Sequence, residues 1–201
     1  MISLAAPDVR FHRSYLAAQD EFDAAGEGTR DGDGVWVEAP EGDFAGVEFT
    51  RAELETPAGF ERFVAHRRGQ VLEDAPRTPG HVPCTFLWVV DDEQPDEHLG
   101  SLAIRHRLTP FLIEIGGHIG YSVRPSARGR GIATEALRLS LPLCRELGMD
   151  EVLVTCSDDN LASASVIEAN GGVLEDVRHL MRRYWIDLAP LTPPPARATP
   201  Q

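Results

Sequence analysis

The residue types best suited to chemistry lie in the stretch from Val123 to Ala133, which reads V-R-P-S-A-R-G-R-G-I-A. It places Gly129 and Gly131 between an alternating apolar pattern and a helical pattern that begins at Ile132. Glycine permits positive φ and close backbone approach, and a helix N-terminus offers unpaired N–H groups and the positive end of its dipole. This order predicts a site for a phosphate or another anion.

Two common phosphate-binding motifs are excluded. The dinucleotide fingerprint requires a third glycine three residues after Gly131, and Thr134 occupies that position. A P-loop requires a lysine after its last glycine, and all 19 basic residues of this chain are arginines. The lack of lysine also excludes lysine Schiff-base chemistry.

The spacing Arg128-x-x-Gly131-x-Ala133 resembles the R/Q-x-x-G-x-G/A signature of the GNAT superfamily of acyl-CoA-dependent N-acetyltransferases. A strand pattern follows at 151–156, and the stretch 160–172 is similar to the Asn-led helix and Gly-Gly turn of that family. The resemblance covers 99–187. It extends to a bacterial branch of predicted acetyltransferases that has I-G-G-H-I-G-Y-S-V-R-P at the same place.

The resemblance implies acetyl-CoA as co-substrate and a place for each of its parts. Its pyrophosphate would lie on the backbone amides of the turn, and its pantetheine would pair along the exposed edge of the preceding strand. Asn160 and Ser163 would contact it from the next helix, although Asn160 is equally suited to capping that helix. The implied binding residues are Ser122, Val123, Arg124, Arg128, Gly129, Arg130, Gly131, Ile132, Ala133, Asn160 and Ser163.

Acetylation of an amine requires a base, because an alkyl amine is mostly protonated at neutral pH. In a strand over 113–123 the even positions are polar or small and the odd ones nearly all apolar, so the even face is the open one. That face carries Glu114 and His118, about 13 Å apart along an extended strand. We expect His118 as first choice for the base and Glu114 as second. A bulge at Gly116-Gly117 would change this assignment.

One position departs from the family pattern. Many members carry a tyrosine that protonates the leaving thiolate, and counting from Asn160 places Ile167 there. Ser165, Tyr121 or solvent could substitute. Three functions therefore stay open: an acetyltransferase for a small-molecule amine, a protein N-acetyltransferase, and a non-catalytic acyl-CoA-binding or sensing module.

Composition and charge narrow the class of protein. The chain has 201 residues, of which 42% are hydrophobic, enough for one domain over 1–188, and the Pro-rich tail 189–201 is predicted to be disordered. No apolar run reaches about eighteen residues and the N-terminus has no signal-peptide pattern, which predicts a cytoplasmic protein without a membrane span. Three scattered cysteines predict buried free thiols and no metal site.

The net charge of −13 belongs entirely to the first hundred residues, which hold 21 acidic and 8 basic side chains. Such a surface argues against a nucleic-acid partner. It could attract a cationic amine acceptor, or serve only as a solvated surface. A homodimer is possible.

The patterns predict an α+β fold, a three-layer arrangement of a mixed, mostly antiparallel six- to seven-stranded sheet with helices on both faces. Helices are expected over 10–25, 57–72, 132–147 and from Asn160, with a glycine-rich loop over 26–46. Strands are expected over 2–6, 84–90, 99–108, 113–123 and 151–156, with a closing hairpin over 173–176 and 179–188.

Overall fold

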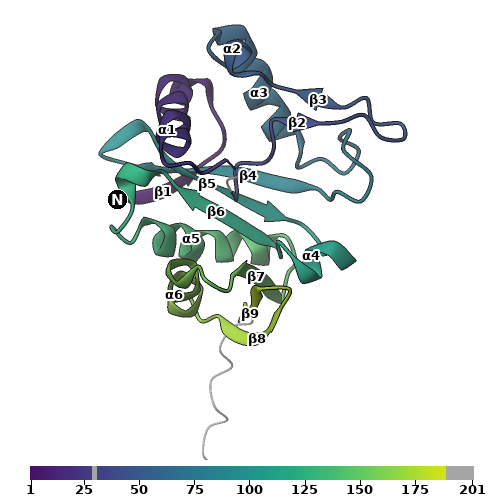
Figure 1. Cartoon of the computed structure of the whole chain (residues 1–201), viewed down its shortest axis with the longest axis vertical. Coiled ribbons are helices and arrows are strands. Elements are labelled where there is room, and N and C mark those ends of the chain that lie inside the picture. The colour runs from purple at the N-terminus through teal and green to yellow at the C-terminus, as the bar shows by residue number, and fades with distance from the viewer. Residues whose placement is uncertain (29–30, 189–201) are drawn as a thin grey trace, which may run out of the picture.

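The computed structural model describes residues 1–28 and 31–188, so the predicted tail at 189–201 lies outside the described residues. The chain forms a mixed seven-stranded sheet in the order β1-β4-β5-β6-β7-β9-β8, in which only β6 and β7 pair in parallel (Figure 1). This confirms the predicted fold class. The strands are β1 (Ile2–Ala5), β4 (Cys84–Asp91), β5 (Gln94–Arg105), β6 (Ile119–Val123), β7 (Glu151–Ser157), β8 (Val173–Arg178) and β9 (Met181–Asp187).

Helices cover both faces of the sheet. On one face lie α1 (His12–Ala24), α2 (Arg51–Leu54), α3 (Pro57–Gly69) and the small hairpin of β2 (Val37–Glu38) and β3 (Val47–Glu48). On the other face lie α5 (Ile132–Glu146) and α6 (Leu161–Ala169). Three short elements complete the fold: α4 (Pro110–Glu114) and the 3-10 turns η1 (Val9–Phe11) and η2 (Pro125–Ala127).

Each face of the sheet has its own core. Under α1 and α3 the core is aromatic, and the ring of Tyr15 stacks on Trp88 with their centroids 5.2 Å apart. Under α5 and α6 it is aliphatic and includes Leu102, Leu137 and Ile167. Burying one such side chain contributes about 1.5–3 kcal/mol, so alternation of apolar residues along β4 and β5 holds a layer of helices on each side.

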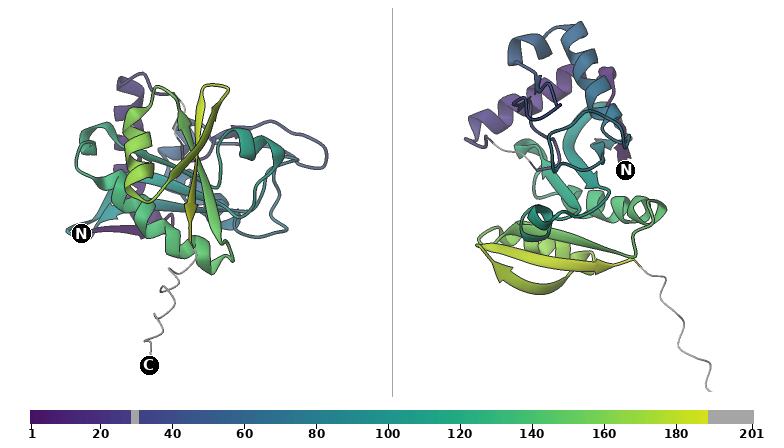
Figure 2. Two further views of the ribbon diagram at one scale, coloured as in Figure 1. Left: turned by 90° about the horizontal axis from the view of Figure 1, so that it is seen from below. Right: turned by 90° about the vertical axis from the view of Figure 1, so that its right-hand side faces the viewer.

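Strands β6 and β7 separate almost as soon as they meet. Ile119 and Val154 are their only paired residues, and β7 continues with β9 and β8 as a separate wing of the sheet (Figure 2). On its other side β6 pairs with β5 over its whole length. Because the N–H of Arg124 and the carbonyl of His118 bond to β5, the backbone groups of Tyr121 and Val123 point toward the opening.

The strand predicted over 113–123 is wrong in its first half. Thr109 caps α4 by accepting the N–H of Leu112, and Pro110 occupies the first helical turn, where its missing N–H has no cost. Gly116 and Gly117 then reverse the chain at φ +104° and +57°, and β6 begins only at Ile119. The pair Thr109-Pro110 is a signal for the start of a helix, but the alternating apolar residues after it favour a strand.

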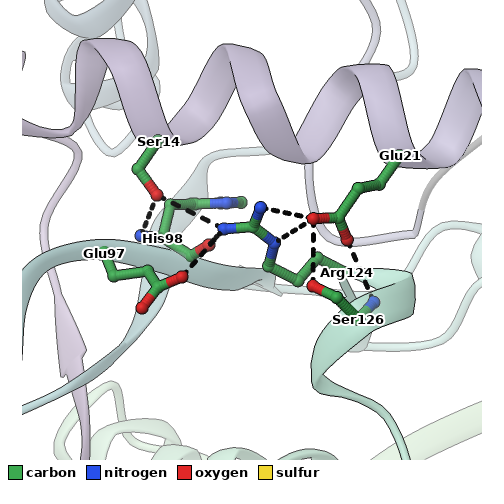
Figure 3. A network of polar contacts seen from close by, with 6 residues as sticks. All are labelled: Ser14, Glu21, Glu97, His98, Arg124 and Ser126. Carbon is green, nitrogen blue, oxygen red and sulfur yellow. Dashed lines mark hydrogen bonds and ion pairs between the residues drawn. The ribbon is translucent and has the colours of Figure 1, made fainter.

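A buried guanidinium joins β6 to α1 and β5 (Figure 3). Arg124 donates Nε to Glu21 Oε1 at 3.1 Å and Nη1 to Glu97 Oε1 at 3.2 Å. The Glu21 carboxylate also accepts the backbone N–H of Ser126 at 3.0 Å, at the start of η2. The hydrogen bond from Arg124 lowers the pKa of Glu21 to about 2. The network fixes the end of β6, and therefore the start of the glycine turn, against α1.

The described part of the chain contains no helix that is both long and apolar enough to cross a membrane. Cys84, Cys144 and Cys156 are free and buried, as predicted. Within 1–28 and 31–188, no group of histidine, cysteine and acidic side chains is arranged to hold a metal ion.

His98 beside this network makes stability depend on pH. Burial, together with the charge of Arg124, lowers the pKa of His98 to about 3. The unfolded chain takes up a proton near pH 6.5 and the folded chain does not, so this contribution is complete above pH 6.5 and is lost as pH falls toward 3. We expect the free energy of unfolding to fall by roughly 2 kcal/mol more between pH 7 and pH 5 in the wild type than in His98→Gln. Urea unfolding at both pH values measures it, and equal decreases would contradict it.

Candidate functional site

The glycine turn before α5 has the geometry of an anion site. Gly129 and Gly131 adopt φ +74° and +73°, and Gly131 is the N-terminal cap of α5. No side chain caps that helix, so hydrogen bonds from side chains do not occupy the N–H groups of its first turn. A Cβ added at either glycine would have no heavy atom within 4 Å, which shows that the space beside the turn is open.

The two arginine side chains of the turn contact Glu27 or solvent. Arg128 forms a two-pronged ion pair with Glu27, both N···O distances being 2.7 Å, and its Nε donates to the carbonyl of Val123 at 3.0 Å. Arg130 is exposed. An anion on this turn would therefore be held mainly by backbone N–H groups of 129–133, and Glu27 would compete for Arg128.

The open edge of β6 leads into the glycine turn. Val123 presents its backbone to the opening between β6 and β7, whereas the backbone groups of Ser122 and Arg124 point to β5. The guanidinium of Arg124 is committed to Glu21 and Glu97. Of the three residues predicted to pair with pantetheine, only Val123 faces the open edge, and Tyr121 joins it there.

Asn160 and Ser163, the two residues predicted to contact coenzyme A from α6, form a small polar group with Tyr121 of β6. Asn160 Oδ1 accepts the N–H of Ser163 at 3.0 Å and so caps α6. Ser163 Oγ lies 2.8 Å from the hydroxyl of Tyr121, and burial raises the pKa of that hydroxyl. Ile167 lies in the core without any exposed surface and cannot donate a proton. Tyr121 therefore places a hydroxyl against α6, the helix on which the family pattern puts a tyrosine.

On the opposite face of the sheet lies a cavity of about 930 Å³. The segment 31–38 and α3 form its walls, β4 and β5 its floor, and 109–112 part of its rim. The glycine-rich pattern over 26–46 predicts a loop and gives no indication that this loop forms a wall of a cavity. Among the described residues, the side chains of Asp, Glu and Arg that line the cavity are Asp23, Asp31, Asp33, Glu38, Arg67 and Arg105.

Asp33 is the cavity carboxylate that the fold positions most firmly. It is only 4% exposed, and it accepts hydrogen bonds from the hydroxyl of Tyr15 at 2.8 Å and from Ser101 Oγ at 3.2 Å. A Cβ at Gly32 would lie 2.6 Å from the carbonyl oxygen of Ser101 and 2.7 Å from that of Gly120. Only glycine permits this approach, which places residue 32 over the β5–β6 pair and Asp33 next to it.

The two residues predicted as bases occupy other positions. Glu114 ends α4 and pairs with Arg178 at 3.3 Å, outside the cavity lining. His118 is buried, and its Nδ1 accepts the backbone N–H of Leu153 at 2.9 Å. Burial, with the charge of Arg105, lowers the pKa of His118 to about 4, so the ring is neutral and carries its proton on Nε2. Its one lone pair is thus occupied, which argues against His118 as a base.

Several solved structures share this fold. Mycobacterium smegmatis RimJ in complex with CoA-disulfide aligns with a TM-score of 0.60 and 17% identity over 92% of this chain and 81% of that one. The ribosomal-protein-S5-alanine acetyltransferase from Vibrio fischeri gives 0.57 and 14% over 96% of each chain. The microcin C7 self immunity acetyltransferase MccE, solved with acetyl-CoA and AMP, gives 0.54 and 14% over 92% of each. No curated protein sequence matches the chain.

Residues 37–173 match the family model described as an acetyltransferase (GNAT) domain. The match spans α3, β4 to β6, the glycine turn, α5, β7 and α6, and the family uses acetyl-CoA as its acyl donor. The chain therefore belongs to the GNAT acetyltransferases.

Proposed function

We propose that the protein transfers the acetyl group of acetyl-CoA to the amine of a small molecule held in the 930 Å³ cavity. The observation that carries this proposal is the contact between Gly32, which lines the cavity, and the carbonyl of Gly120, next to Tyr121 on the open edge of β6. Pantetheine paired along Tyr121 and Val123 would bring its thioester to the point where the cavity meets the sheet.

The reaction assigns a role to each side of the sheet. The amine nitrogen attacks the thioester carbon, the C–N bond forms, the C–S bond breaks, and coenzyme A leaves as a thiolate. We propose that Asp33 accepts the amine proton, directly or through water, because it is the buried carboxylate next to residue 32, over the β5–β6 pair. The Tyr121 hydroxyl or solvent returns a proton to the thiolate.

The coenzyme A site is proposed over the turn and the two flanking elements. The backbone N–H groups of Gly129 to Ala133 would receive the pyrophosphate, with Arg128 joining them when it leaves Glu27. Asn160 and Ser163 border the same opening from α6.

A protein N-terminus is the second candidate acceptor. Val35, Val37 and Phe111 are exposed apolar side chains on the cavity lining, and such residues suit the first side chains of an extended peptide. Thiol release measured with small amines and with short peptides separates the two acceptors. A third possibility, the acyl-CoA sensor, requires that no amine be acetylated although acetyl-CoA binds.

Gly131→Asp tests the turn. The new carboxylate repels the pyrophosphate at the helix N-terminus, and we expect coenzyme A affinity to fall at least tenfold, about 1.4 kcal/mol, by calorimetry. Gly131→Asn is the matched control, because asparagine tolerates positive φ and carries no charge. Equal affinities of the Asp and Asn variants would show that the anion does not bind at this turn.

Asp33→Asn tests the base. The amide keeps an acceptor oxygen for Tyr15 or Ser101 but cannot take up a proton, so we expect kcat to fall about 10²-fold with acetyl-CoA affinity unchanged. His118→Asn is the comparison, because its Oδ1 replaces Nδ1 as acceptor for Leu153, and we expect it to keep activity within about threefold. The reverse pattern in two folded variants would return the role of base to His118.

A further inference from the structure

Arg67 is a buried cation in the cavity wall. It lies on α3, is only 3% exposed, and its guanidinium carbon stands 4.6 Å from the ring centroid of Phe63 and 5.0 Å from that of Phe86. Nη2 donates to the carbonyl of Val35 at 2.8 Å, while Nε is buried without a hydrogen-bond partner. Among residues 1–28 and 31–188, no carboxylate forms an ion pair with Arg67.

A buried guanidinium without a counter-ion is unusual, because removing a charge from water is costly unless an opposite charge compensates it. One backbone carbonyl and two aromatic rings compensate only part of that cost. The guanidinium lies near two rings and lines the cavity, and its Nε has no hydrogen-bond partner, so it can receive a ligand there. A carboxylate matches a guanidinium, because its two oxygens accept parallel N–H groups.

Arg105 provides a second positive charge on the cavity floor. Its Nη1 donates to the carbonyls of Gly116 at 2.8 Å and Gly117 at 3.3 Å, and it has no ion-pair partner in the part of the chain that the structure describes. A Cβ at Gly120 would lie 3.6 Å from Arg105 Nη1 and Nη2 and 3.2 Å from the backbone nitrogen of Gly32, and a Cβ at Gly34 would lie 3.0 Å from Arg67 Cζ. The two guanidinium groups thus lie near opposite ends of the segment 32–34, and both line the cavity.

Most negative charges of the cavity lie on a different segment. Asp31, Asp33 and Glu38 belong to the 31–38 wall and Asp23 to α1, whereas the two arginines come from α3 and β5. Gly34, next to Asp33, contacts the Arg67 guanidinium, since a Cβ there would be 3.0 Å from Cζ. Opposite charges therefore line one cavity within a short distance of each other. A ligand that carries both an ammonium and an anion fits this division.

We propose that the acceptor is an amine that also bears a carboxylate, of the amino-acid class, with its carboxylate on Arg67 and Arg105 and its amine directed to Asp33. This rests on the proposed function and defines its substrate class. The surplus of carboxylates in the first hundred residues then attracts only the ammonium group of the acceptor. An acceptor without an anionic group would leave Arg67 and Arg105 without a negative charge to pair with.

The test compares acceptors that differ only in the anion. Each of the twenty standard α-amino acids is paired with its α-amide, and thiol release gives kcat/KM for both. The amides have the less basic amine and hence more of the reactive neutral form, so a preference for the acid cannot come from amine basicity. We expect at least one acid to exceed its amide by about thirtyfold or more, mainly through KM.

Two variants test whether Arg67 and Arg105 cause the preference for the acid over the amide. Arg67→Met keeps the length and apolar packing of the side chain and removes the charge, and we expect it to reduce the preference below about threefold, with Arg67→Lys intermediate. If Arg67→Met does not fold, Arg105→Met is expected to reduce the same ratio. A readout without turnover is the thermal shift given by the N-acetylated product acid against its amide, which we expect in the wild type and not in the variant.

Three results would overturn the inference. The wild type could use acids and amides equally, or the preference for the acid could persist in folded Arg67→Met. The third result is a thermal shift that is the same for the N-acetylated acid and its amide. Turnover of the amides or of simple amines in any of these cases would leave the proposed transferase intact. If acetyl-CoA binds and no amine of any class releases thiol, the proposed function itself is wrong.

Discussion

The separation of β6 from β7 is the constraint on which the rest of the site depends. A parallel pair normally continues its ladder, yet here one residue pair holds the strands together and the next four residues of β6 have a neighbour on one side only. The unpaired backbone groups need partners, since such groups are costly when buried. The buried network of Arg124 keeps that edge straight from the other side, so the opening is a fixed feature of the fold.

Much of this was predictable from the sequence. Alternating apolar residues gave the central strands, helical periodicity gave α1, α3 and α5, and the two glycines before Ile132 gave the turn, because each of these patterns reflects local geometry. The capping role of Asn160 was also foreseeable from its position before an alanine-rich helix. The family resemblance then located the coenzyme A side, although the contacts of its individual residues stay predictions.

The acceptor side was much less predictable. Its wall is a glycine-rich segment whose position depends on a contact between Gly32 and the carbonyls of two strands, about seventy and ninety residues away, and no local pattern encodes such a contact. The argument for His118 as the base depended on a strand through 113–118, and that strand was wrong because Thr109 and Pro110 start a helix there. The role of His118 itself stays a prediction. The burial of Arg67 could not be predicted, because a helical pattern does not distinguish a buried arginine from an exposed one.

Two ion pairs join α1 and the residues just after it to the end of β6 and the glycine turn: Arg124 with Glu21, and Arg128 with Glu27. The proposed sites of the two substrates would therefore not be independent. If the pyrophosphate draws Arg128 away from Glu27, the segment that begins at Glu27 loses an anchor, and the affinity for the second substrate changes. Thermodynamic linkage makes the effect reciprocal: the factor by which acetyl-CoA alters acceptor binding is the factor by which the acceptor alters acetyl-CoA binding. An exchange of partner at Arg128 would thus couple the two binding events, in whichever order the substrates enter.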